Sequence, residues 1–233
     1  MIYLDNAATT KVDDKVINEM NNYHSKNYGN ASSKHFHGVE LKKKVSQAKE
    51  TISGLINCKK EEICFTSGAT EAINMAFKGY AESNISLGNH IITTKVEHKA
   101  VLEVCKYLEN IGFDVTYLDV DNNGLIDLNE LKNSIKTETI LVSVLWVNNE
   151  TGIIQDLKAI SSIVKQSNAK LFIDATQAVG KIDVDLNQTH IDMLCFSGHK
   201  LHGPKGIGVL YIKDGIKLSP LIMGGGQEKG LRS

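Results

Sequence analysis

Proline and cysteine are scarce in this sequence, and neither sign of charge dominates. The 233 residues include two prolines and four cysteines, and 26 basic against 27 acidic side chains give a net charge of −1. No proline-rich linker, repeat or low-complexity stretch marks a domain boundary. The mixed charge leaves no basic stripe of the kind that binds nucleic acid. We therefore expect residues 1–233 to form one large domain.

Long apolar runs are missing as well. No stretch approaches the ~18 apolar residues of a membrane span, and the opening MIYLDNAATT lacks the basic start and apolar core of a signal peptide. CxxC spacing is absent from the cysteines, which are Cys58, Cys64, Cys105 and Cys195. This scatter argues against a disulfide framework or a zinc site and favours reduced thiols. We expect a cytoplasmic protein with no metal site and no membrane contact.

What the sequence does contain is an alternation of two patterns. Short apolar runs rich in β-branched residues predict strands at 63–67, 90–95, 113–118, 140–146, 170–174, 192–197 and 206–212. Helix-like segments lie between them, at 71–83, 98–110, 128–135 and 156–167. The alternation predicts an α/β fold with a mainly parallel central sheet and helices on both faces. Such sheets bind ligands beyond the carboxyl ends of their strands.

The segment CFSGHKLHGPKG places a lysine at such a strand end. The predicted strand ends at Ser197, and His199 and Lys200 follow. Partial desolvation at the end of a buried strand lowers a lysine pKa and favours a Schiff base with an aldehyde. Ser197 and His199 add donors that could hold an anion. Taken alone, the segment fits a surface lysine in a turn somewhat better, because lysines in turns are common.

Two further strand ends carry polar groups. Asp174 ends the strand KLFID, where its carboxylate could pair with a pyridinium nitrogen, and Gln177 could donate to a ring oxygen. The alternative is that Asp174 caps the next helix. In FTSGATEAIN, small residues and free N–H groups at a helix start, including Ala69 and Thr70, favour a phosphate. The alternative is an ordinary turn; the segment is not a P-loop.

The remaining candidates follow two more strands. His98, in TTKVEHKAV, could stack on a flat ring and move protons near neutral pH, although a lone histidine is more often structural. Asn148 and Asn149, in WVNNETG, could hold a carboxylate or a ring oxygen, or could simply form a turn. Each signal is weak alone. Together they supply an amine, a carboxylate, a stacking ring and anion donors at one edge of one sheet.

A competing motif lies between residues 119 and 130. Its order, D-x-D-x-N-G and then Glu130, fits a calcium-binding EF-hand loop. The preceding segment alternates like a strand, however, whereas an EF-hand needs an entering helix. The alternative is a turn at Asn123-Gly124, with Asp127 capping the following helix. We favour the turn.

In these segments and in others along the chain, the sequence resembles the cysteine desulfurases of the NifS/IscS type. These are fold-type-I pyridoxal-phosphate enzymes of the class-V aminotransferase family. The resemblance extends over essentially all of residues 1–233. It rests on YLDNAATT (3–10), FTSGATEAIN (65–74), TTKVEHKAV (93–101), NGLIDLNEL (123–131), VNNETGIIQD (147–156), DATQAVGK (174–181), FSGHKLHGPKGIG (196–208) and GGGQEKGLRS (224–233).

The resemblance implies a role for each candidate. Lys200 binds pyridoxal 5'-phosphate as a Schiff base, His98 stacks on the ring and assists proton transfer, and Asp174 pairs with the ring nitrogen. Gln177 and Asn149 contact the ring oxygen and the substrate side. The phosphate ligands it implies are Ala69, Thr70, Ser197 and His199.

The resemblance also implies an activity and partners. L-cysteine becomes L-alanine, and the sulfur passes as an enzyme persulfide to iron–sulfur cluster assembly or tRNA thiolation. Expected partners are a second copy of the chain and a scaffold or sulfur-acceptor protein. The family's small C-terminal domain, with its sulfur-accepting cysteine, has no counterpart in this sequence, so we expect these residues alone not to complete turnover. The alternatives are a selenocysteine lyase or other lyase on the same scaffold, and a non-catalytic dimerisation or partner-binding fragment.

Overall fold

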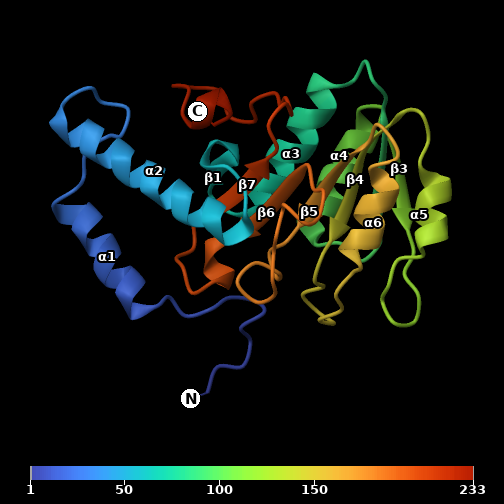
Figure 1. Ribbon diagram of the computed structural model, residues 1–233, viewed down its shortest axis with the longest axis horizontal. Helices are drawn as coiled ribbons and strands as arrows, with labels where there is room; N and C mark the ends of the chain where they lie inside the picture. Colours follow the sequence, from blue (N-terminus) through green and yellow to red (C-terminus); the bar gives the residue numbers. More distant parts are fainter. Residues whose placement is uncertain (1, 233) are drawn as a thin grey trace.

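One mixed sheet organises the protein, which a computed structural model describes for residues 2–232 (Figure 1). The strands are β1 (Ile63–Thr66), β2 (His90–Thr94), β3 (Asp114–Leu118), β4 (Thr139–Leu145), β5 (Lys170–Asp174), β6 (Met193–Ser197) and β7 (Gly208–Ile212). Their spatial order is β1-β7-β6-β5-β4-β2-β3. Strand β7 is antiparallel to β1 and β6, and the other neighbouring pairs are parallel. The predicted mainly parallel sheet is confirmed, and every predicted run coincides with one strand.

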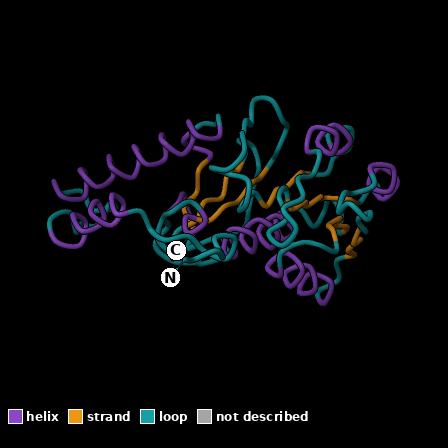
Figure 2. The backbone as a smooth tube through the Cα atoms, turned by 90° about the horizontal axis from the view of Figure 1, so that it is seen from below, coloured by secondary structure: helices purple, strands orange, loops and turns teal. Residues whose placement is uncertain are grey.

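Helices cover both faces of this sheet, as predicted (Figure 2). Helices α3 (Ala69–Ser83) and α4 (Lys99–Asn110) pack on one face, where the ring centroids of Phe77 and Phe172 lie 5.3 Å apart. Helices α5 (Leu128–Ser134) and α6 (Leu157–Val164) pack on the other. Covering both faces buries every residue of β4, which is why that strand is mostly apolar and does not alternate between apolar and polar residues.

Two N-terminal helices were not predicted. Helix α1 (Asp14–Ser25) begins at Asp13, whose carboxylate accepts a hydrogen bond from the Lys15 N–H at 2.8 Å. Helix α2 (Phe36–Ile56) continues beside it, and the pair forms an arm that reaches away from the sheet (Figure 1). None of the residues of α1 is buried. The arm has little core against which to pack apolar side chains, and it precedes the strand–helix alternation on which the prediction of helices rested.

The calcium-like motif between residues 119 and 130 forms a turn, as favoured above. It follows strand β3 instead of a helix. The Asp121 carboxylate accepts hydrogen bonds from the Asn123 and Leu125 N–H groups, and Gly124 has a φ of 77°. Asp127 caps α5 by accepting from the Asn129 and Glu130 N–H groups. The acidic side chains therefore serve the turn and the helix cap. Within the described residues, no helix is long and apolar enough to cross a membrane.

Candidate active site

A cavity of about 630 Å³ opens where the parallel strands end. The last residues of three neighbouring strands line it, namely Leu145 of β4, Asp174 of β5 and Ser197 of β6. All nine predicted site residues line this one cavity: Ala69, Thr70, His98, Asn149, Asp174, Gln177, Ser197, His199 and Lys200. The expected meeting of these groups at one sheet edge is therefore confirmed, while their individual roles toward a cofactor stay predictions.

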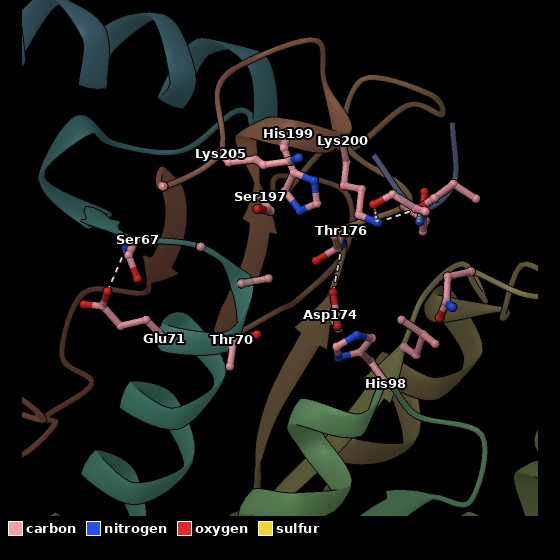
Figure 3. Close-up of a pocket in the computed structure, with 18 of the residues that line it drawn as sticks. Ser67, Thr70, Glu71, His98, Asp174, Thr176, Ser197, His199, Lys200 and Lys205 are labelled. Carbon is pink, nitrogen blue, oxygen red and sulfur yellow. Dashed lines mark hydrogen bonds between the residues drawn. The ribbon is translucent and has the colours of Figure 1, made fainter. Parts of the chain in front are cut away.

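Lys200 lies at the end of a 3₁₀ turn, Gly198–Lys200, that directly follows β6. Its side chain points into the cavity (Figure 3), where Nζ donates hydrogen bonds to the carbonyl oxygens of Ala7 and Ala8. Burial lowers the pKa of this ammonium, and the nearby charge of Lys181 lowers it further. The carboxylates of Asp5 and Asp174 act in the opposite direction. The net shift is downward, which is the direction expected for a lysine at the end of a buried strand.

The N-terminal segment lies across the site, which the sequence did not reveal. The Thr10 N–H and hydroxyl both donate to the His199 carbonyl at 2.9 Å, and the Thr9 hydroxyl lies 3.0 Å from His199 Nδ1. Residues Asp5, Ala7 and Ala8 thereby become part of the cavity wall. The segment YLDNAATT had been noted only for its resemblance. Small residues in a short turn carry no periodicity that would indicate a contact with residues so distant in the chain.

Asp174 is 2% exposed, and its carboxylate faces the cavity. Its Oδ1 also accepts a hydrogen bond from the Thr176 N–H at 2.9 Å. The capping alternative is wrong, because no α-helix follows Asp174 and its carboxylate closes a turn instead. Gln177, 6% exposed, donates through Nε2 to the Ala7 carbonyl at 2.8 Å. The Thr176 hydroxyl has no hydrogen-bond partner within residues 2–232, although it lines the cavity.

The start of α3 forms the opposite wall. The Glu71 carboxylate accepts from the Ser67 N–H at 2.7 Å and from Arg232 Nε at 2.6 Å, which fixes the loop between β1 and α3. A Cβ atom on Gly208 would lie 2.5 Å from the Cα of Gly68, so this loop approaches β7 as only glycine allows. The open N-terminal N–H groups of α3, beside Ser197 and His199, suit an anion.

His98 begins α4. Its Nδ1 accepts a hydrogen bond from the Ala100 N–H at 3.1 Å, so the neutral ring carries its proton on Nε2. Asn149 also lines the cavity, and its amide donates to the Glu150 carboxylate at 2.6 Å. Asn148 instead holds its loop together by donating to the Val96 carbonyl at 3.2 Å.

Glu97, the residue before His98, is a buried acid that the sequence did not single out. Its Oε1 accepts hydrogen bonds from the Leu145 N–H at 2.8 Å and the Thr94 hydroxyl at 3.0 Å. Burial, with a contribution from the negative charge of Asp174, raises the pKa of this carboxyl to about 8. Glu97 therefore joins the start of α4 to the strand end beside Asp174, and its raised pKa favours the uncharged form at neutral pH.

A comparison with known protein families matches residues 2–232 to the aminotransferase class-V family. The chain belongs to this family. Among curated relatives, it is 52% identical over 237 residues to the cysteine desulfurase IscS of Buchnera aphidicola subsp. Acyrthosiphon pisum and 47% identical over 232 residues to that of Clostridium botulinum. Both matches cover 100% of this class-V chain, which spans 59% and 58% of the two relatives.

Solved structures agree with this assignment. A NifS-like protein superposes with a TM-score of 0.97 at 45% identity, and the match covers 100% of this chain and 64% of that one. A structure described as SspA in complex with cysteine gives a TM-score of 0.96 at 40% identity, with coverage of 100% and 67%. The resemblance to cysteine desulfurases of the NifS/IscS type is therefore confirmed for the matched part of the chain.

Proposed function

We propose that this chain forms the pyridoxal-phosphate-binding part of a cysteine desulfurase, which converts L-cysteine to L-alanine and passes the sulfur to a thiol as a persulfide. The observation that carries the proposal is the convergence of Lys200, Asp174 and His98 with the start of α3 on one cavity. The names and identities of the relatives support the substrate class.

The cavity fits this cofactor in three respects. The Lys200 amine, with its lowered pKa, suits an aldehyde. The buried carboxylate of Asp174 suits a ring nitrogen. The N–H groups at the start of α3, which follow the close approach of Gly68 to Gly208, suit a phosphate.

When bound, pyridoxal phosphate would supply an electron sink for the carbanion that forms at the substrate's α-carbon. The chain's own residues would supply binding and proton transfer. Lys200 would hold the aldehyde and then move protons as a neutral amine. The Nδ1 atom of His98 accepts a hydrogen bond from the helix backbone, so the neutral ring carries its proton on the other nitrogen, Nε2. Gln177 presents an amide N–H₂ group to the cavity side.

The acceptor of the sulfur is proposed to lie outside residues 2–232. Cys64, Cys105 and Cys195 are buried, Cys58 is half-buried, and none of these thiols lines the cavity. Burial also raises their pKa values, that of Cys58 to about 12, so each thiol resists forming the reactive thiolate.

We further propose a cytoplasmic location and a homodimer that serves an iron–sulfur scaffold or another sulfur acceptor. The unpaired thiols are compatible with a reducing compartment. The arm of α1 and α2 exposes apolar side chains that a second copy could cover, including Ile17, Tyr28 and Phe36. Light scattering coupled to size-exclusion chromatography tests the dimer, and a monomer at micromolar concentration would contradict it.

The function itself is tested by adding L-cysteine to the pyridoxal-phosphate-loaded protein and recording the cofactor's absorbance spectrum. We expect L-cysteine to change the spectrum and L-serine to leave it largely unaltered at the same concentration. The Lys200→Arg variant keeps the positive charge but cannot form the Schiff base, so it should lack the absorbance band of the lysine-bound cofactor before either amino acid is added. An equal response to both amino acids in the unmodified protein would argue against cysteine as the substrate.

A further inference from the structure

Lys181 lies next to the proposed cofactor site without lining it. It ends the turn that follows β5, where its N–H donates to the Ala178 carbonyl at 3.0 Å. Leu201, the residue after Lys200, packs against this turn. A Cβ on Gly180 would lie 2.6 Å from Leu201 Cδ2, and Gly180 has a φ of 76°. Glycine at this position therefore keeps the two lysine-bearing segments in close contact.

A chain of hydrogen bonds connects the two lysines. Lys181 Nζ donates to Oε1 of Gln177, and Gln177 Nε2 donates to the Ala7 carbonyl at 2.8 Å. Lys200 Nζ donates to that same carbonyl and to the Ala8 carbonyl at 2.6 Å. An ammonium has donors and no acceptor, so Lys181 determines which end of the Gln177 amide it contacts. The amide N–H₂ group is thereby directed toward Ala7 and the cavity.

The positive charge of Lys181 also affects the pKa of Lys200. It is the largest contribution after burial to the lowered pKa of Lys200, against the opposing charges of Asp5 and Asp174. Partial burial lowers the pKa of Lys181 itself. Lys181 is on the solvent side of the buried Gln177, so it can order that amide without occupying the cavity.

We propose that Lys181 is a positioning residue of the cofactor site, which fixes the Gln177 amide and, through the shared Ala7 carbonyl, the amine of Lys200. The inference rests on the proposed function because it assigns Gln177 and Lys200 to cofactor binding. The simpler alternative is a surface contact between residues four apart in a turn, which would leave the behaviour of Lys200 unchanged.

The experiment compares Lys181→Met and Lys181→Arg with the unmodified protein, first without cofactor. Brief acetylation with acetic anhydride over a pH series, followed by mass spectrometry of the Lys200 peptide, reports the protonation of Lys200. We expect Lys181→Met to move the labelling midpoint of Lys200 to higher pH, because a cation is lost and the freed Gln177 oxygen can turn toward Lys200. Lys181→Arg should restore the original midpoint. Lys158→Met, which removes a cation from α6, is the matched control and should leave it unchanged.

The second readout is the dissociation constant of pyridoxal phosphate, measured by its absorbance. We expect Lys181→Met to bind about tenfold more weakly, equivalent to roughly one hydrogen bond to a charged group, and Lys181→Arg to recover most of the affinity. If the urea midpoint of Lys181→Met is lowered, Lys181→Gln is measured instead. It keeps a donor for Gln177 and loses the charge, so it should retain the cofactor affinity and still move the Lys200 midpoint to higher pH.

The two proposals fail in different ways. If Lys181→Met matches the unmodified protein in both the Lys200 midpoint and cofactor affinity, the positioning role is wrong and the cofactor site stands. If the unmodified protein does not bind pyridoxal phosphate at all, the proposed function is wrong, and the labelling still decides whether Lys181 controls Lys200.

Discussion

Replacing Glu97 by glutamine should change how the stability of the protein depends on pH. Burial raises the pKa of the Glu97 carboxyl from 4.5 to about 8. In the unfolded chain the same carboxyl loses its proton near its ordinary pKa. Between these two values the unfolded state binds fewer protons, so the free energy of unfolding falls as pH rises. In this range the free energy of unfolding falls by about 1.4 kcal/mol per pH unit, which amounts to roughly 3 kcal/mol between about pH 5 and pH 7.

Glutamine cannot ionise, so this pH-dependent cost disappears in Glu97→Gln. The amide oxygen can still accept from the Leu145 N–H and the Thr94 hydroxyl. The N–H₂ group replaces Oε2, which has no partner within the described residues, at a cost of about 1–3 kcal/mol that does not vary with pH. The free energy of unfolding of the variant minus that of the unmodified protein should therefore rise by roughly 3 kcal/mol from about pH 5 to pH 7.

The assay is urea unfolding followed by circular dichroism at half-unit steps of pH. Glu103→Gln is the control, because Glu103 is an exposed acid on α4 whose pKa is lowered by Lys106 and which does not titrate in this range. Its stability curve should run parallel to that of the unmodified protein. If the curve of Glu97→Gln also runs parallel, Glu97 is ionised in the folded protein, and the description of a neutral acid beside Asp174 is wrong.

Three further outcomes are expected. Burial lowers the pKa of His90, whose Nδ1 lies 2.7 Å from the Thr139 hydroxyl. The contribution of His90 to the free energy of unfolding should therefore be fully present above about pH 6.5 and be lost as pH falls below that value. Urea midpoints should show that His90→Gln abolishes this pH-dependent loss. Gly208→Ala should weaken pyridoxal-phosphate binding by at least about tenfold in an absorbance titration, since its Cβ would displace the loop at Gly68, whereas Gly54→Ala, with open space around it, should bind normally. Cys195, fully buried with its pKa raised by burial, should resist iodoacetamide until urea unfolds the protein, and rapid labelling of the folded protein would contradict its placement.

The sheet could be predicted because its strands are buried on both faces. Runs such as ILVSVLW have no polar alternation, and the chain between them has helical spacing, so the class and layering follow from local pattern. The arm could not be predicted in the same way. Helices α1 and α2 pack against little of the core and precede the first strand, so the alternation of strands and helices did not mark them.

The site residues likewise fall into those that follow a regular element and those whose contacts depend on the complete fold. Lys200, Asp174 and His98 could be found because each follows a predictable strand, and the ends of parallel strands meet at one edge. Ala7 and Ala8 could not, because their contact with Lys200 depends on how a segment without periodicity crosses the finished fold. Glu97 and Lys181 were missed because their importance comes from burial and from hydrogen-bond partners, which only the three-dimensional structure supplies.

The central claim is that Lys200 holds pyridoxal phosphate, and borohydride reduction tests it most directly. The protein is incubated with pyridoxal phosphate, reduced and digested, and the modified peptide is mapped by mass spectrometry. The account predicts a phosphopyridoxyl adduct on Lys200, with Lys181 and Lys205 unmodified at stoichiometric cofactor. An adduct spread over several surface lysines, or none at all, would contradict it.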